Sequence, residues 1–167
     1  MGFVNPRQFI YQGIKFLFLF SFLQFLLLQI YCIEGTSMEP TLRSKFWVLV
    51  NPLKPLMKFP ERNEIIVFKL NKSNDILIKR LIGLPGERIE FYEGKLYIDG
   101  VPSRENFSHL STFEDFDSYT IPTGHVLVIG DNRSSSMDSR SFGAIPIRNI
   151  FGTGSMILWP FNKISFL

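Results

Sequence analysis

An apolar run near the amino terminus is the feature that most limits how this chain can fold. Residues 16–33 read FLFLFSFLQFLLLQIYCI and carry no charged side chain. A helix of about 20 apolar residues is long enough to cross a lipid bilayer. A secretory signal peptide usually has an apolar core of about 7–15 residues followed by a small-x-small site. This run is longer and its end offers no small pair, so we expect one retained transmembrane helix.

The charges around this run predict its orientation. Only Arg7 and Lys15 are charged before Glu34, and no basic residue follows the run until Arg43. The positive-inside rule places such an amino terminus in the cytoplasm. We therefore expect a single-pass protein of the inner (plasma) membrane. Residues 1–33 would form the cytoplasmic terminus and the anchor, and residues 34–167 an extracytoplasmic domain.

The composition of residues 34–167 excludes several classes of protein. They carry 16 basic and 15 acidic residues without a basic cluster, so nucleic acid is not an expected partner. Cys32 is the single cysteine of the chain, which rules out a disulfide within it. The chain is 46% hydrophobic, which is ample apolar material for a folded core.

Short β-rich runs separated by turn formers dominate the same region. They lie at residues 46–50, 64–70, 76–84, 88–92, 95–98, 125–129 and 155–159. This spacing predicts an all-β fold, a mainly antiparallel sandwich or barrel. The Glu93-Gly94 pair between two such runs predicts a tight hairpin. Residues 101–120 are polar, and we expect them to form a surface loop or a small insertion.

Two turn-rich segments and one strand carry side chains capable of chemistry. GTSMEPTL (residues 35–42) presents Ser37 in a turn, and GDNRSSSMDSRSFG (residues 130–143) is a polar loop after a strand. In the strand, alternation places Lys79 between two leucines on one face. Burial lowers the pKa of a lysine amine, and a neutral amine can act as a general base. Taken singly, these are an ordinary turn serine, surface loop and edge lysine.

Together, in this order and spacing, GTSMEPTL, IKRLIGLPGE and GDNRSSSMDSRSFG resemble the bacterial type I signal peptidases, or leader peptidases. The resemblance covers nearly the whole chain, including the anchor. It implies a serine endopeptidase that removes N-terminal signal peptides from exported preproteins after small-x-small sites. By motif match, Ser37 is the expected nucleophile, Lys79 the general base, and Ser136 a serine that orients the lysine.

The resemblance also implies a set of supporting residues. Asp138 and Arg140 match a structural ion pair beneath the site, and Asp131 falls in the same supporting motif. Some family members place a serine two residues before the nucleophile, but this chain has Gly35 there. The Ser37 backbone N–H is therefore the expected oxyanion donor, and the second donor is left open.

Substrate and membrane contacts are expected from position along the chain. Candidates to line shallow pockets that accept alanine are Ile33, Met38, Leu42, Val48 and Ile78. Candidates to contact the bilayer surface are Phe46, Trp47, Trp159 and Phe161. The expected partners are signal peptides of preproteins and membrane lipid. No cofactor and no metal ion is expected.

Three alternatives remain open from the sequence. A mitochondrial inner-membrane peptidase subunit has a similar motif order, and a self-cleaving repressor uses the same serine–lysine catalytic dyad. A membrane-anchored β domain that binds without cleaving is the third. No catalytic role is assigned to His109 or His125, so a serine–histidine triad is not expected.

Overall fold

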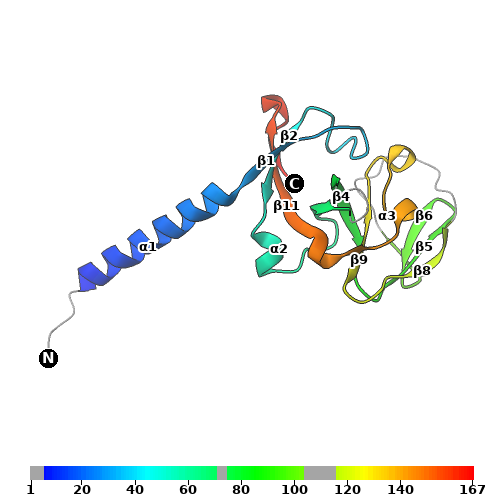
Figure 1. Ribbon diagram of the computed structural model, residues 1–167, viewed down its shortest axis with the longest axis horizontal. Helices are drawn as coiled ribbons and strands as arrows, with labels where there is room; N and C mark the ends of the chain where they lie inside the picture. The colour runs from blue at the N-terminus through cyan, green and yellow to red at the C-terminus, as the bar shows by residue number, and fades with distance from the viewer. Residues whose placement is uncertain (1–5, 71–74, 104–115) are drawn as a thin grey trace.

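The computed structural model describes residues 6–70, 75–103 and 116–167. Helix α1 (Pro6–Leu27) extends away from a body made almost entirely of β-strands (Figure 1). Two sheets form this body, and every strand pairing described in them is antiparallel. The expectation of an all-β, mainly antiparallel domain is therefore confirmed.

The larger sheet has eight strands in the order β1-β2-β11-β3-β4-β9-β10, with β12 paired to β11. Their bounds are β1 (Gln29–Cys32), β2 (Trp47–Asn51), β3 (Ile65–Lys69), β4 (Ile76–Gly83), β9 (His125–Ile129), β10 (Ile145–Pro146), β11 (Ile150–Trp159) and β12 (Ser165–Phe166). Strands far apart in the chain are neighbours, so loops from distant segments meet around this sheet.

The smaller sheet has the order β7-β6-β5-β8. Its strands are β5 (Arg88–Tyr92), β6 (Lys95–Ile98), β7 (Val101–Pro102) and β8 (Phe116–Thr120). The expected hairpin joins β5 to β6, where Glu93 and Gly94 have φ angles of 50° and 71°. Short helices complete the fold: α2 (Lys54–Met57), α3 (Ser139–Phe142), η1 (Arg133–Ser135), η2 (Ile147–Asn149) and η3 (Phe161–Lys163).

The apolar run near the amino terminus is not one continuous helix. Helix α1 ends at Leu27, and β1 begins at Gln29 and pairs with β2. The expected helix through residue 33 is therefore wrong at its carboxyl end, because branched and aromatic side chains there favour a strand and Ile33 is buried in the core. Within the described residues, no helix combines the length and the apolar character needed to cross a bilayer.

The expected loop over residues 101–120 is also wrong at both ends. Val101–Pro102 forms β7, and Phe116–Thr120 forms β8 along β5. Tyr119 of β8 packs against a core cluster, and this contact outweighs the polar composition of the segment. Residues 104–115, including His109, lie outside the described residues.

Three buried clusters form the core of the body. The first joins the loop after β1 to strands β2, β3 and β11 (Ile33, Met38, Leu42, Val48, Val50, Ile65, Val67 and Ile157). The second lies around β3, β4 and β9, and the third joins β4 and β9 to the smaller sheet. The first cluster fixes the base of the loop that carries Ser37.

Candidate active site

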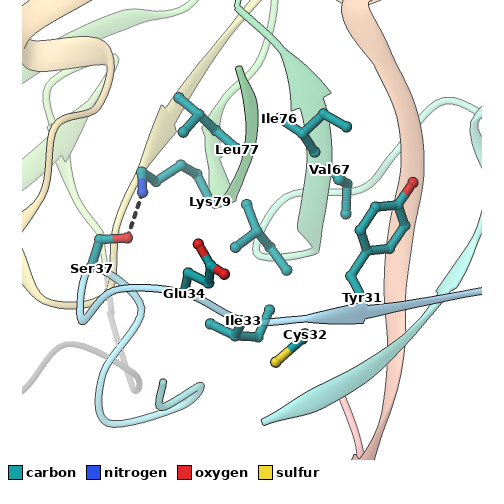
Figure 2. Close-up of a pocket in the computed structure, with 10 residues that line it drawn as sticks. Tyr31, Cys32, Ile33, Glu34, Ser37, Val67, Ile76, Leu77 and Lys79 are labelled. Atoms are coloured by element: carbon teal, nitrogen blue, oxygen red, sulfur yellow. Dashed lines mark hydrogen bonds between the residues drawn. The ribbon is translucent and has the colours of Figure 1, made fainter. Parts of the chain in front are cut away.

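The residues singled out by the sequence come together where the loop after β1 meets β4. The Lys79 Nζ atom lies 2.6 Å from the Ser37 Oγ atom and donates a hydrogen bond to it (Figure 2). The two residues are 42 positions apart in the chain, so only the fold brings them into contact. The structure therefore places a nucleophile candidate and a base candidate at the distance that proton transfer requires.

Lys79 is held in an apolar setting. Its side chain projects from β4, opposite Ile66 on β3, and the residue is 4% exposed. Burial lowers the pKa of the Lys79 amine below its ordinary value of 10.5, although the carboxylates of Asp138 and Asp131 act to raise it. Burial has the larger effect, so the amine gives up its proton more readily than a surface lysine.

The loop after β9 positions the Ser37 loop through two hydrogen bonds from Asn132. The Asn132 backbone N–H donates to the Ser37 carbonyl at 3.0 Å, and its side-chain amide donates to the Thr36 carbonyl at 3.1 Å. The sequence suggested only turn capping for Asn132. This contact joins segments 95 residues apart, and no local pattern reports it.

Gly130 is the second positioning residue that sequence reasoning missed. A β-carbon at residue 130 would lie 2.4 Å from the Ser37 carbonyl oxygen and 2.3 Å from the Ser136 Oγ atom. Both distances are far below van der Waals contact. The close approach of three chain segments at this point therefore requires a residue without a side chain.

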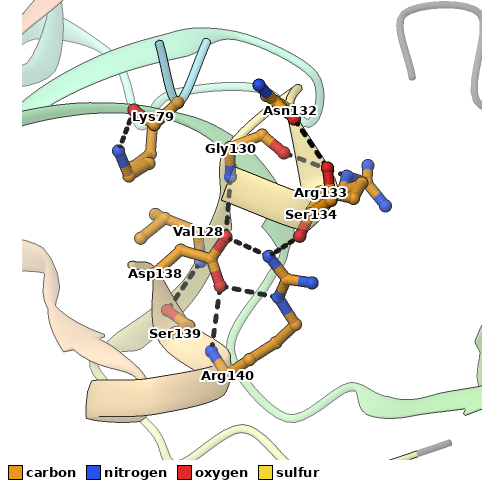
Figure 3. Close-up of polar contacts among 10 residues, drawn as sticks. Lys79, Val128, Gly130, Asn132, Arg133, Ser134, Asp138, Ser139 and Arg140 are labelled. Atoms are coloured by element: carbon orange, nitrogen blue, oxygen red, sulfur yellow. Dashed lines mark hydrogen bonds and ion pairs between the residues drawn. The ribbon is translucent and has the colours of Figure 1, made fainter. Parts of the chain in front are cut away.

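Asp138 is the centre of the polar network beneath the site. Its carboxylate accepts hydrogen bonds from the Gly130 N–H at 3.0 Å and from the Arg140 side chain at 2.8 Å to each oxygen (Figure 3). Burial acts to raise the pKa of Asp138, but hydrogen bonds from Arg140 and Gly130 lower it below its ordinary value. The structure thus contains the expected pair between Asp138 and Arg140.

Asp131 pairs with a residue that the sequence did not single out. Arg80, which follows Lys79 on β4, donates to both Asp131 oxygens, at 2.8 Å and 2.6 Å. Arg80 also donates to the Asn63 carbonyl at 2.6 Å. Because side chains alternate along a strand, Lys79 and Arg80 leave β4 on opposite faces, and the ion pair fastens β4 to the loop after β9.

Ser136 lies close to the site but shows no direct contact with the lysine. Its Oγ atom is inaccessible to solvent and has no hydrogen-bond partner of regular geometry among the described residues. The same atom lies against Gly130, next to the Ser37 loop. The role of Ser136 in orienting Lys79 therefore stays a prediction.

A cleft of about 280 Å³ opens beside Ser37 and Lys79. Of the five expected substrate contacts, Ile33 and Ile78 line it. Met38, Leu42 and Val48 do not, because they are at most 1% exposed and belong to the first core cluster. The cleft is lined by Tyr31, Cys32, Ile33, Glu34, Ser37, Val67, Ile76, Leu77, Ile78 and Lys79.

The described histidine lies outside this arrangement. His125 begins β9, and its ring nitrogen Nδ1 is 3.1 Å from the carbonyl oxygen of Thr123. It does not line the cleft. The contact between a serine and a lysine is thus the acid–base arrangement that the described residues present at the cleft.

Comparison with known protein families decides the assignment. The family model described as "Signal peptidase, peptidase S26" matches residues 7–159. The chain belongs to the signal peptidase family, peptidase S26. The resemblance inferred from the three motifs is therefore confirmed at the level of the family.

Individual relatives in the signal peptidase family come from bacteria and plants. Signal peptidase I of Bacillus caldolyticus is 39% identical over 150 residues, which cover 81% of this chain and 82% of that protein. Thylakoidal processing peptidase 1 of Arabidopsis thaliana is 33% identical over 144 residues, which cover 80% of this chain but only 42% of that protein. The chain therefore spans less than half of the plant relative.

A crystal structure of a signal peptidase I from Enterococcus faecalis V583 resembles the fold. The two chains are 36% identical, with a TM-score of 0.52. The match covers 57% of this chain and 97% of the other. This likeness agrees with the β-rich body built around the cleft.

Adding a methyl group at Gly130 tests the close approach of the three segments. We expect Gly130→Ala to displace the Ser37 carbonyl and lower kcat/KM for peptide cleavage by about 10²-fold, since misplacement by about 1 Å costs that much. Gly13→Ala is the control, because a β-carbon there meets no atom within 4 Å. Equal activity of the two variants would contradict the packing constraint.

The buried amine predicts a pH-dependent stability change for Lys79→Met. The folded-state pKa lies below 10.5, so below pH 10.5 the unfolded chain binds a proton that the folded chain resists. The wild-type lysine therefore destabilises the fold increasingly as pH falls. Thermal unfolding should show a gain in Tm for Lys79→Met at pH 7 that disappears near pH 10.5. For exposed Lys95, the Lys95→Met variant should show no such pH trend.

Loss of the Asp138 charge should destabilise the body directly. We expect Asp138→Asn to lower the free energy of unfolding at pH 7 by about 3–5 kcal/mol, because Arg140 loses its buried partner. The Asp138 pKa is lowered in the fold, so this contribution is present at neutral pH and is lost as acid protonates the carboxyl group. Denaturant unfolding at pH 7 and at pH 3 measures the difference. If Asp138→Asn lowered the free energy of unfolding equally at both pH values, the stabilising role of the Asp138 charge would be contradicted.

Proposed function

We propose that this protein is a membrane-associated serine endopeptidase that removes N-terminal signal peptides from exported preproteins, with Ser37 as nucleophile and Lys79 as general base. The observation that carries the proposal is the 2.6 Å contact between the Ser37 hydroxyl and a buried amine of lowered pKa, at the edge of an apolar cleft. The family assignment supports the same activity.

The proposed reaction has two halves, acylation and deacylation. In each half, Lys79 accepts one proton and then releases it. The neutral lysine lone pair accepts the hydroxyl proton while the Ser37 oxygen attacks the scissile carbonyl carbon. The carbon–nitrogen bond then breaks, and the protonated lysine gives its proton to the leaving amine. Water next attacks the acyl-enzyme while Lys79 takes a proton from it; the ester carbon–oxygen bond breaks, the acid product leaves, and Lys79 returns the proton to the Ser37 oxygen.

The loop around Ser37 supplies a donor for the oxyanion. The Ser37 backbone N–H donates to no acceptor within the described part of the chain, so it is available for the developing negative charge. Gly35, with a φ angle of 85°, occupies the place where some relatives have a serine. One oxyanion donor typically contributes about 2.7–4 kcal/mol to transition-state stabilisation.

An extended peptide fits the free strand edges at the cleft. On one side, residues 76–79 of β4 pair with β3, and β9 pairs with β4 only from Arg80 onward. The edge of residues 76–79 that points away from β3 therefore faces the cleft, opposite the end of β1, without a partner strand among the described residues. A peptide that adds a strand there would place its scissile carbonyl at Ser37.

Small side chains suit the apolar surface of this cleft. Ile33 and Ile78 line it, while Met38, Leu42 and Val48 lie in the core cluster that Ile33 also joins. Branched side chains packed against such a core leave shallow recesses that accept alanine and exclude larger residues. This agrees with cleavage after a small-x-small sequence. Substrate contact by all five residues stays a prediction.

We also propose that the amino-terminal segment associates with lipid. The described side chains of α1 are exposed and include Phe9, Phe16 and Phe18. On the body, Trp47, Trp159 and Phe161 are exposed, whereas Phe46 packs on the core. The cytoplasmic amino terminus and the division between residues 33 and 34 stay predictions. Pairing of β1 with β2 supports moving that division to the amino-terminal side of β1.

Replacing either member of the pair tests the proposed function. We expect Ser37→Ala and Lys79→Ala each to lower cleavage of an Ala-x-Ala preprotein by at least about 10³-fold, because they serve one proton transfer. Lys79→Arg should fail as well, since a guanidinium group stays protonated. In the wild type, kcat/KM should rise with pH through a Lys79 pKa below 10.5.

Exposed residues of the same types supply the controls. Ser44→Ala and Lys95→Ala should retain wild-type activity, because both side chains are exposed and lie away from the cleft. Circular dichroism should show that Ser37→Ala keeps the fold. If Lys79→Ala still cleaves at a rate comparable to the wild type, the assignment of the base is wrong. If the wild-type chain cleaves no preprotein, the alternative of a membrane-anchored β domain that binds without cleaving would be favoured.

A further inference from the structure

Glu34 is an ionisable residue in the cleft that the proposed mechanism does not use. It lies two residues after the end of β1 and three residues before Ser37, and its side chain is exposed. Figure 2 shows the carboxylate turned into the space between the end of β1 and Lys79. A charged group at this place lies beside any peptide whose carbonyl reaches Ser37.

The charge of Glu34 is not neutralised by the rest of the cleft. Within the described part of the chain, no lysine or arginine forms an ion pair with it. The carboxylates that act on the Lys79 pKa are Asp138 and Asp131, which lie beneath the site. Apart from Lys79, the other lining residues carry no charge (Tyr31, Cys32, Ile33, Ser37, Val67, Ile76, Leu77 and Ile78).

The position of Glu34 selects one residue of the substrate. An extended chain advances about 3.3 Å per residue, so the three residues before the scissile bond pass along this part of the cleft. In a small-x-small sequence, the first and third of these must be small. Only the middle residue is free to carry a long charged side chain. Because neighbouring side chains alternate, the side chain of this middle residue points away from the apolar residues that line the cleft and toward the exposed side, where Glu34 lies.

We propose that Glu34 sets a charge preference for this middle residue, favouring lysine or arginine and disfavouring aspartate or glutamate. The inference rests on the proposed function and adds a substrate class to it. A bound peptide excludes water from the cleft, which strengthens the interaction between two charges there. Glu34 would attract a basic middle residue and repel an acidic one. The ratio of kcat/KM for the two kinds of substrate therefore reports the effect of Glu34 directly.

Three peptides that differ at one residue test the proposal. Each carries an Ala-x-Ala site with lysine, glutamine or glutamate in the middle, and kcat/KM is measured with the full-length chain in detergent at low salt. For the wild type, we expect the lysine peptide to be cleaved about tenfold faster than the glutamate peptide, with glutamine between them. This ratio should fall as salt is added.

Two substitutions at Glu34 and one control assign the effect. Glu34→Gln should bring the ratio close to one, and Glu34→Lys should reverse it. Glu39→Gln removes a carboxylate two residues after Ser37 that does not line the cleft, so it should keep the wild-type ratio. Reversal by Glu34→Lys would show that the residue acts on the substrate.

Two results would overturn the inference without touching the proposed function. The first is a lysine-to-glutamate ratio near one in the wild type while all three peptides are cleaved. The second is a ratio unchanged in Glu34→Lys, with one shift of the pH profile common to all peptides, which would mean that Glu34 acts only through Lys79. If no peptide is cleaved, or if Ser37→Ala cleaves them equally well, the proposed function itself fails.

Discussion

The burial of one lysine amine against one hydroxyl is the constraint around which the rest of this structure is arranged. An amine in an apolar strand costs free energy, and the fold sustains that cost because Lys79 is buried on an interior strand of the larger sheet. The ion pair of Arg80 with Asp131 fixes the strand that carries the lysine. The pair of Asp138 with Arg140 fixes the loop behind it. Both carboxylates therefore organise the site while staying bound to arginines.

Local patterns in the sequence predicted much of the fold. The strands at 88–92, 95–98 and 125–129 occur at the expected residues, because alternating apolar residues and turn formers act over short distances. Strand β1 was missed since its residues continue an apolar run, and only pairing with β2 separates it from the helix. Strand β8 was missed because its contacts come from β5, about 30 residues away.

The candidate site shows the same division between local and long-range information. Ser37, Lys79 and Asp138 were found from motif order; the structure brings Lys79 into contact with Ser37 and has Asp138 accept a hydrogen bond from Gly130 beside the Ser37 loop. Asn132 and Gly130 act by approaching Ser37 from another segment, and their residue types are equally common in ordinary turns. The partner of Asp131 could not be predicted either, because an arginine on a strand carries no mark of the loop it will meet.

The junction between α1 and β1 has a mechanical consequence. Leu28 alone separates the end of the helix from the first strand of the sheet. Such a short connection cannot absorb rotation as a flexible linker does. A change in the tilt of α1 would therefore be transmitted to β1, whose end forms one side of the cleft. The geometry of the cleft is thus coupled to whatever holds the helix in place.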